Sequence, residues 1–74
     1  MMNWRSASQI DVSLAGKPVL VCAIAGKQRR YFATRVKMES SHLYVESRSM
    51  KICLDDLPVS GIDELLYVRI DEIL

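Results

Sequence analysis

The chain has 74 residues, of which 50% are hydrophobic and 26% charged, and its formal net charge is +1. This length allows one domain and no second, and the hydrophobic content is far from that of disordered chains. The longest apolar run, from Pro18 to Ala25, is too short for a transmembrane helix, and the first residues lack the apolar stretch of a secretory signal. We therefore expect a single small cytoplasmic domain that does not bind a membrane.

The charges are unevenly distributed along the chain. Positions 17 to 51 hold eight basic and two acidic residues, whereas positions 52 to 74 hold six acidic residues and one arginine. This separation predicts either an anion-binding face kept apart from an acidic face, or two surfaces that meet within or between subunits.

The first half of the chain is typical of a β-meander. Residues 9–14 alternate strictly between polar and apolar, which predicts a first strand with one buried face. The turn sequence Ala15-Gly16-Lys17 recurs as Ala25-Gly26-Lys27, about one strand later. Residues 19–24, between the two turns, are apolar on both faces, so we expect this strand in the middle of a small barrel or at an interface.

The next strands are also predicted from alternation. Residues 30–39 read as one long strand with Phe32, Thr34, Val36 and Met38 on one face, and Tyr31, Ala33, Arg35, Lys37 and Glu39 on the other. A strand over residues 42–47 follows the Ser40-Ser41 turn, and a short strand places Ile52 and Leu54 inward.

The last segment allows two interpretations. Residues 65–70 are rich in β-forming residues, but the spacing of the apolar residues from Ile62 to Leu74 also fits one face of a helix. We favour the strand because the rest of the chain is rich in strands. The predicted fold is mainly β, a small antiparallel barrel or curled sheet of five or six strands, with a short C-terminal helix as the alternative for this segment.

No catalytic or metal-binding signature is present. His42 is the only histidine, and the chain has no Gly-x-Ser-x-Gly elbow and no phosphate-binding glycine-rich loop. Cys22 and Cys53 are too few for a four-ligand zinc site even with His42. A single disulfide is one interpretation, but a cytoplasmic location favours two reduced thiols. We expect that the protein is not an enzyme and that it binds neither a metal ion nor a cofactor.

The basic stretch is the best functional candidate. Arginine and lysine neutralise phosphates and carboxylates, and an outward tyrosine can stack on a base. This predicts a face that binds an anionic macromolecule, either RNA, DNA or an acidic protein surface. The alternative is a set of solvated charges that protect a sheet edge from aggregation. The residues concerned are Lys27, Arg29, Arg30, Tyr31, Arg35 and Lys37.

The hydrophobic excess favours self-association. A chain this short buries its apolar residues incompletely, so an apolar stripe near the C-terminus predicts a homodimer. We expect Leu65 and Tyr67 at or near the contact. A purely structural homo-oligomeric subunit is therefore an alternative function.

Two resemblances to known families add to these expectations. The segment from Asp11 to Gly16, Asp-Val-Ser-Leu-Ala-Gly, resembles the Asp/Asn-x-Ser-x-x-Gly motif of PilZ domains, which are β-barrels that bind cyclic di-guanylate with an Arg-x-x-x-Arg motif. In that family the arginine motif comes first, whereas here Arg30 and Arg35 follow it and are separated by four residues. The resemblance implies a cyclic-dinucleotide receptor as an alternative function.

The second resemblance covers residues 14–73 and concerns strand rhythm. A Gly-Lys-Pro-Val-Leu-Val segment, a long strand over residues 30–39, a short strand at Leu43 and the segment from Ile52 to Leu57 are similar to the pattern of Sm-like and SH3-like small barrels. That resemblance implies RNA binding or assembly through strand edges.

Overall fold

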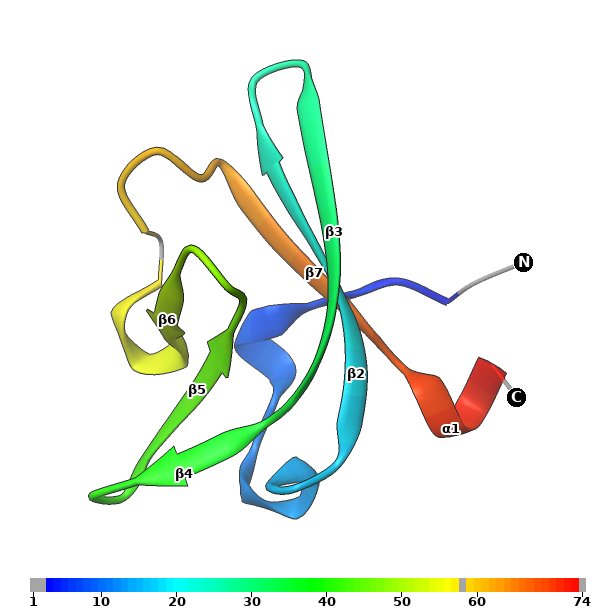
Figure 1. The fold of residues 1–74 in the computed structure, drawn as a ribbon, viewed down its shortest axis with the longest axis vertical. Helices are drawn as coiled ribbons and strands as arrows, with labels where there is room; N and C mark the ends of the chain where they lie inside the picture. Colours follow the sequence, from blue (N-terminus) through cyan, green and yellow to red (C-terminus); the bar gives the residue numbers. More distant parts are fainter. Residues whose placement is uncertain (1–2, 58, 74) are drawn as a thin grey trace.

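The computed structural model describes residues 3–57 and 59–73. Its strands form two antiparallel sheets (Figure 1). Sheet A has the order β1 (Arg5–Ser6), β7 (Glu64–Arg69), β2 (Pro18–Ala25) and β3 (Gln28–Arg35). Sheet B has the order β4 (Lys37–Glu39), β5 (His42–Glu46) and β6 (Lys51–Cys53). The remaining elements are three short 3-10 turns and one helical turn: η1 (Ala7–Gln9), η2 (Val12–Leu14), η3 (Leu54–Asp56) and α1 (Ile70–Ile73).

The prediction of a mainly β, antiparallel fold with a short C-terminal helix is confirmed. Within the described ranges, no strand pairing closes the two sheets into a barrel. The chain passes from sheet A to sheet B at Val36, which is buried and lies between β3 and β4. Its N–H donates to the carbonyl of Lys17 and its carbonyl accepts from the N–H of Gly16. These bonds pair Val36 with the residues just before β2, at the point where the predicted long strand is divided into β3 and β4. In sheet A, β3 is an edge strand.

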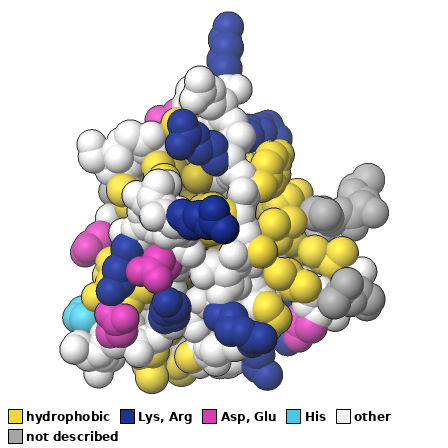
Figure 2. Space-filling view, viewed as in Figure 1, with side chains coloured by type: hydrophobic (Ala, Val, Ile, Leu, Met, Phe, Trp, Pro, Cys, Tyr) yellow, Lys and Arg dark blue, Asp and Glu magenta, His cyan; other side chains and the backbone are white. Residues whose placement is uncertain are grey.

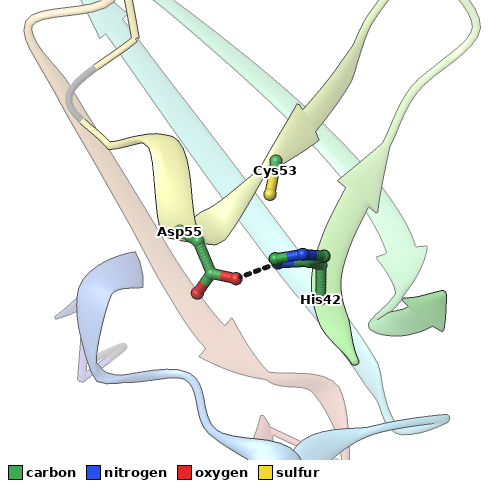
Figure 3. A group of neighbouring side chains, drawn as sticks. All are labelled: His42, Cys53 and Asp55. Carbon is green, nitrogen blue, oxygen red and sulfur yellow. Dashed lines mark hydrogen bonds and ion pairs between the residues drawn. The ribbon is translucent and has the colours of Figure 1, made fainter. Parts of the chain in front are cut away.

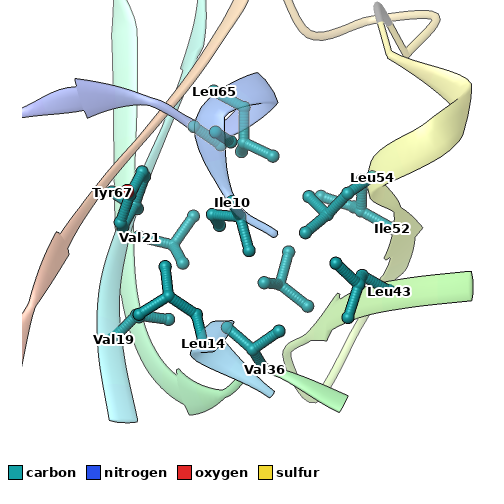
Figure 4. Close-up of a cluster of buried hydrophobic side chains, with 13 residues drawn as sticks. Ile10, Leu14, Val19, Val21, Val36, Leu43, Ile52, Leu54, Leu65 and Tyr67 are labelled. Carbon is teal, nitrogen blue, oxygen red and sulfur yellow. The ribbon is translucent and has the colours of Figure 1, made fainter. Parts of the chain in front are cut away.

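The hydrophobic core lies between the two sheets (Figure 4). Alternate residues of β2 and β7 point into it from sheet A, and alternate residues of β5 point into it from sheet B, as the period of two in a strand requires. The core side chains are Ala7, Ile10, Leu14, Val19, Val21, Ala23, Val36, Leu43, Val45, Ile52, Leu54, Leu65 and Tyr67.

The predicted first strand, residues 9–14, is wrong. This part of the chain forms η1, a connecting residue pair and η2. The carboxylate of Asp11 accepts a hydrogen bond from the N–H of Ser13 at 3.0 Å and caps η2. Short polar side chains of this kind compete with strand pairing by bonding to the local backbone. Ile10 and Leu14 are buried, as alternation predicted, but Val12 between them is exposed.

The other predicted strands lie close to the observed ones. Residues 19–24 lie within β2, residues 42–47 contain β5, and residues 30–39 are divided between β3 and β4. Met38, predicted to point inward, is exposed on β4, an edge strand of sheet B.

The C-terminal segment contains both alternatives in succession, first β7 and then α1. The guanidinium of Arg69, the last residue of β7, donates to both carboxylate oxygens of Asp71 at 3.0 and 2.6 Å. This pair lowers the pKa of the Asp71 carboxyl, mainly through the hydrogen bond from Arg69. The bidentate bond holds the helical turn against the end of the strand.

Among the described helices, none has the length and apolarity needed to cross a membrane.

Candidate functional site

The predicted basic face is divided between the two sides of sheet A. In the β2–β3 pairing, Arg30 lies opposite Ala23, which points into the core, whereas Arg29 lies opposite Ile24 on the outer face. Directly opposed residues in an antiparallel pair share a face. Arg30 therefore points toward sheet B, and Arg29 points away from it.

Two of the predicted residues are already bonded within the chain. The ammonium of Lys37 lies 2.8 Å from the carboxylate of Glu46, and this hydrogen bond lowers the pKa of the Glu46 carboxyl. The guanidinium of Arg35 donates to the carbonyl of Gly16 at 2.9 Å. Lys27, Arg29 and Arg30 are exposed and form no ion pair with the described residues. Figure 2 shows Lys and Arg side chains over the front of the molecule, from the tip of the β2–β3 hairpin downward.

The ring of Tyr31 and the side chain of Arg30 lie on opposite faces of sheet A. The Tyr31 ring lies on the outer face of sheet A, with its centroid 6.0 Å from that of Trp4 and the two ring planes tilted by 51°. The side chain is 56% exposed. The predicted stacking platform therefore lies on the opposite side of the sheet from Arg30.

A groove brings Arg30 close to an arginine that the sequence analysis did not single out. Arg48 belongs to the turn between β5 and β6, and both arginines line a cavity of about 380 Å³ between this turn and β3. Phe32 and Met50, which pack against the core, line it too. Arg48 is one of the eight basic residues between positions 17 and 51, but its position opposite β3 depends on how the two sheets pack and could not be predicted from local patterns. The lining residues are Ala23, Arg30, Tyr31, Phe32, Ala33, Ser47, Arg48, Ser49 and Met50.

The groove follows the free edge of β3. The β2–β3 hairpin turns through Gly26 and Lys27, with Ala25 paired to Gln28, and Gly26 has the positive φ (+61°) common in such turns. In a two-residue hairpin the residues next to the turn exchange hydrogen bonds, and every second residue beyond them directs its N–H and C=O away from the partner strand. These outward groups belong to Arg29, Tyr31 and Ala33.

The outer face of sheet B is polar, and its charges are paired. Besides the Lys37–Glu46 pair, the ammonium of Lys51 lies 2.7 Å from the carboxylate of Glu39. It also lies 4.7 Å from the centroid of the Tyr44 ring. The hydrogen bond to Glu39 raises the pKa of Lys51. These charges hold one another in place and are not free for a ligand.

Three possible metal ligands meet at the end of this face (Figure 3). His42 is on β5, Cys53 ends β6, and Asp55 lies in η3. The Nδ1 atom of His42 is 2.6 Å from a carboxylate oxygen of Asp55, and one donor atom of each residue lies within 4.8 Å of the others. Both cysteines are free thiols, as the sequence analysis favoured.

The PilZ-like residues are engaged in local bonds. Asp11 accepts hydrogen bonds from the backbone and the hydroxyl of Ser13, and the bond from that hydroxyl is the main reason that the pKa of Asp11 is lowered. Arg35 reaches the carbonyl of Gly16, the last residue of the motif. Arg30 lines the groove between β3 and sheet B.

The residues predicted for a dimer contact lie elsewhere than expected. Leu65 is 4% exposed and Tyr67 is 3% exposed, and both belong to the core of the chain itself. They point inward because they lie opposite Ala23 and Val21, two core residues of β2. They therefore do not form an exposed stripe, and the homodimer stays a prediction that needs another surface.

Comparisons with known proteins give no family for the chain: no family model, no curated protein and no solved structure matches it.

Proposed function

We propose that this protein is a non-enzymatic binding module that takes up an extended acidic segment of a partner protein along the edge of β3. The observation that carries the proposal is the groove that joins this free strand edge to Arg30 and Arg48. The proposal keeps the predicted anionic partner and moves its site from the whole basic stretch to one side of it.

Backbone groups supply the first part of the recognition. An extended peptide that lies beside an exposed strand forms main-chain hydrogen bonds with it, and its alternate side chains enter pockets on either side. The outward N–H and C=O groups of Arg29, Tyr31 and Ala33 are of the kind this binding mode uses. Phe32 and Met50 offer an apolar surface beside them.

Charge supplies the second part. Arg30 and Arg48 line the groove from opposite walls, one on β3 and one on the β5–β6 turn. Carboxylates on the inserted segment would form charge-assisted hydrogen bonds with the two guanidinium groups. β3 carries three arginines and no acidic residue, so a second copy of β3 paired at this edge would offer no carboxylate to Arg30 and Arg48.

A nucleic acid is a weaker candidate for the same groove. The net charge is only +1 and the isoelectric point is about 7.8, whereas nucleic-acid-binding domains are commonly strongly basic. Single strands also bind through exposed aromatic side chains. The exposed Tyr31 ring lies on the other side of sheet A, against Trp4.

The test is fluorescence anisotropy with a short labelled peptide of alternating Glu and Val. We expect saturable binding that Arg30→Glu and Arg48→Glu each abolish, while Lys17→Glu, a charge reversal outside the groove, leaves it unchanged. A peptide of equal charge with Pro in place of Val should not bind, because proline has no N–H to donate to the strand. Equal binding of both peptides, or preference for a single-stranded oligonucleotide, contradicts the proposal.

A second function, homodimerisation, is favoured by the outer face of sheet A. Figure 2 shows hydrophobic side chains gathered on the side of the molecule where the chain ends lie. Strand alternation places on this face the half-buried Leu20, Ile24 and Leu66 and the exposed ring of Tyr31, with Trp4 beside Tyr31. Cys22 and Val68, which lie on the same face, are buried within the chain itself. Apolar surface of this kind is typical of a contact between subunits.

Two opposite charges at the rim of the outer face of sheet A, Arg29 and Glu64, favour one direction for the two-fold axis of a dimer. Arg29 on β3, Ile24 on β2 and Glu64 on β7 form one row across the sheet. A two-fold axis parallel to β2 would place β3 over the partner subunit's β7, and Arg29 over Glu64 of the partner subunit, twice. An axis perpendicular to the strands would bring Arg29 toward Arg35 of the partner subunit. Charge therefore favours the first arrangement, in which the strands of the two sheets run nearly parallel to the axis.

A further inference from the structure

The side-chain cluster of His42, Cys53 and Asp55 lies outside both the groove and the outer face of sheet A. We propose that it is a binding site for a divalent metal ion, zinc in the first place. Neither the binding of an acidic segment nor the dimer requires these residues.

The chemistry of the three donors favours zinc. A thiolate, an imidazole and a carboxylate are the ligand types that zinc takes in proteins, and the mixed set is too soft for calcium or magnesium. A zinc ion with one thiolate and one carboxylate is a neutral assembly. Lys51, two residues before Cys53, is bonded to Glu39 and lies over the Tyr44 ring, so its charge is balanced and does not oppose a cation at the site.

The geometry requires only small side-chain movements. Ligand atoms around a tetrahedral zinc stand about 3.4 Å apart, as bond lengths of about 2.0 to 2.3 Å dictate. Here the Nδ1 of His42 and the Oδ2 of Asp55 are 2.6 Å apart, and all three donor atoms lie within 4.8 Å of one another. His42 and Asp55 are exposed, so both side chains can separate to admit the ion.

The three ligands belong to neighbouring elements of sheet B and the turn that follows it. His42 and Cys53 are on neighbouring strands of sheet B, β5 and β6, and Asp55 is two residues beyond Cys53 in η3. Tyr44 lies directly opposite Cys53 in the β5–β6 pairing. The side of the cluster open to solvent leaves the fourth position to water.

Cobalt provides a readout that identifies the ligands. Co²⁺ added to the reduced protein is expected to give two spectral features. One is a thiolate-to-cobalt charge-transfer band in the near ultraviolet, and the other is the set of visible bands of a tetrahedral cobalt ion. Added Zn²⁺ should remove both features. Cys53→Ser should abolish the ultraviolet band, whereas Cys22→Ser, which changes the buried thiol of sheet A, should retain it. His42→Ala and Asp55→Asn should each weaken binding at least about tenfold, since even groups that only support a ligand often contribute that much.

Zinc should also raise the melting temperature of the wild-type protein, because an ion that binds only the folded state stabilises it. That shift should be absent in Cys53→Ser and present in Cys22→Ser. An absent charge-transfer band in folded wild-type protein overturns the proposal. A band that persists in Cys53→Ser, or that is lost in a folded Cys22→Ser variant, overturns it as well.

Discussion

The outer faces of the two sheets differ in how their charged and apolar groups are satisfied. On sheet B, Lys37 is paired with Glu46, and Lys51 is paired with Glu39, so these charged groups have partners within the chain and the polar face can stay exposed to water. On sheet A, the outer face is largely apolar, and Arg29 has no ion-pair partner in the described part of the chain. Among the described strands, none pairs with the outer edge of β3 in the same sheet. This contrast is the basis of our proposal that partners bind on the side of sheet A.

The largest expected effect is on the free energy of unfolding, and it comes from the two neighbouring leucines of β7. Leu65 points into the core and Leu66 points to the outer face of sheet A. We expect Leu65→Ala to lower the free energy of unfolding by about 2 to 5 kcal/mol, the usual range for a buried leucine. Urea denaturation of both alanine variants at a concentration where the protein is monomeric measures the difference. Similar losses for Leu65→Ala and Leu66→Ala would show that the outer face is as well covered within the monomer as the core.

The next largest expected effect is the loss of the predicted dimer in a variant that still folds. Leu66→Glu should convert the predicted dimer to a monomer in sedimentation velocity, because it places a charge in the apolar centre of the contact. Met38→Glu, which also replaces an exposed apolar residue but on sheet B, is the matched control and should leave the mass unchanged. Wild-type protein that sediments as a monomer at low micromolar concentration would remove the dimer from the account.

The direction of the dimer axis can be tested by charge reversal. Arg29→Glu should weaken the dimer through repulsion from Glu64 of the partner subunit, and the double variant Arg29→Glu/Glu64→Arg should restore it. Arg29 and Glu64 flank Ile24 on separate strands, so the exchange leaves the charge of the row unchanged. A double variant as weak as the single one would favour a different axis.

The smallest expected effect concerns the ion pairs of sheet B. Hydrogen bonding to Lys37 lowers the pKa of the Glu46 carboxyl below its usual value of 4.5. A lowered pKa stabilises the fold above the unfolded-state pKa, and this contribution is lost as the pH falls through the folded-state pKa. The unfolding free energy of Glu46→Gln should therefore fall less than that of wild type between pH 5 and about pH 3. Parallel pH profiles for the two proteins would contradict the prediction.

Local patterns predicted the strands that depend on alternation and missed what depends on long-range packing. The apolar run over residues 19–24, bounded by two glycine turns, and the alternation over residues 30–35 correspond to β2 and β3. The pattern over residues 9–14 was misleading, since the bonds between Asp11 and Ser13 form a turn that is not visible from alternation.

The faces of β7 were harder to predict for a different reason. Leu65 and Leu66 are adjacent and equally apolar, so their assignment to core or surface depends on the register with β2. The groove and the cluster of His42, Cys53 and Asp55 could not be predicted from local patterns for a related reason. Arg30 and Arg48 line one groove, and His42 contacts Asp55, only because separate strands and turns are packed together.

The most direct test of the account is amide hydrogen exchange by NMR along β3, with and without the alternating Glu-Val peptide. If the peptide adds a strand to the edge, the amides of Tyr31 and Ala33, which point away from β2, become protected from exchange, while those of β4 in sheet B are unchanged. Saturable peptide binding with no new protection at Tyr31 and Ala33 would contradict the account, because the segment would then bind without pairing to the edge of β3.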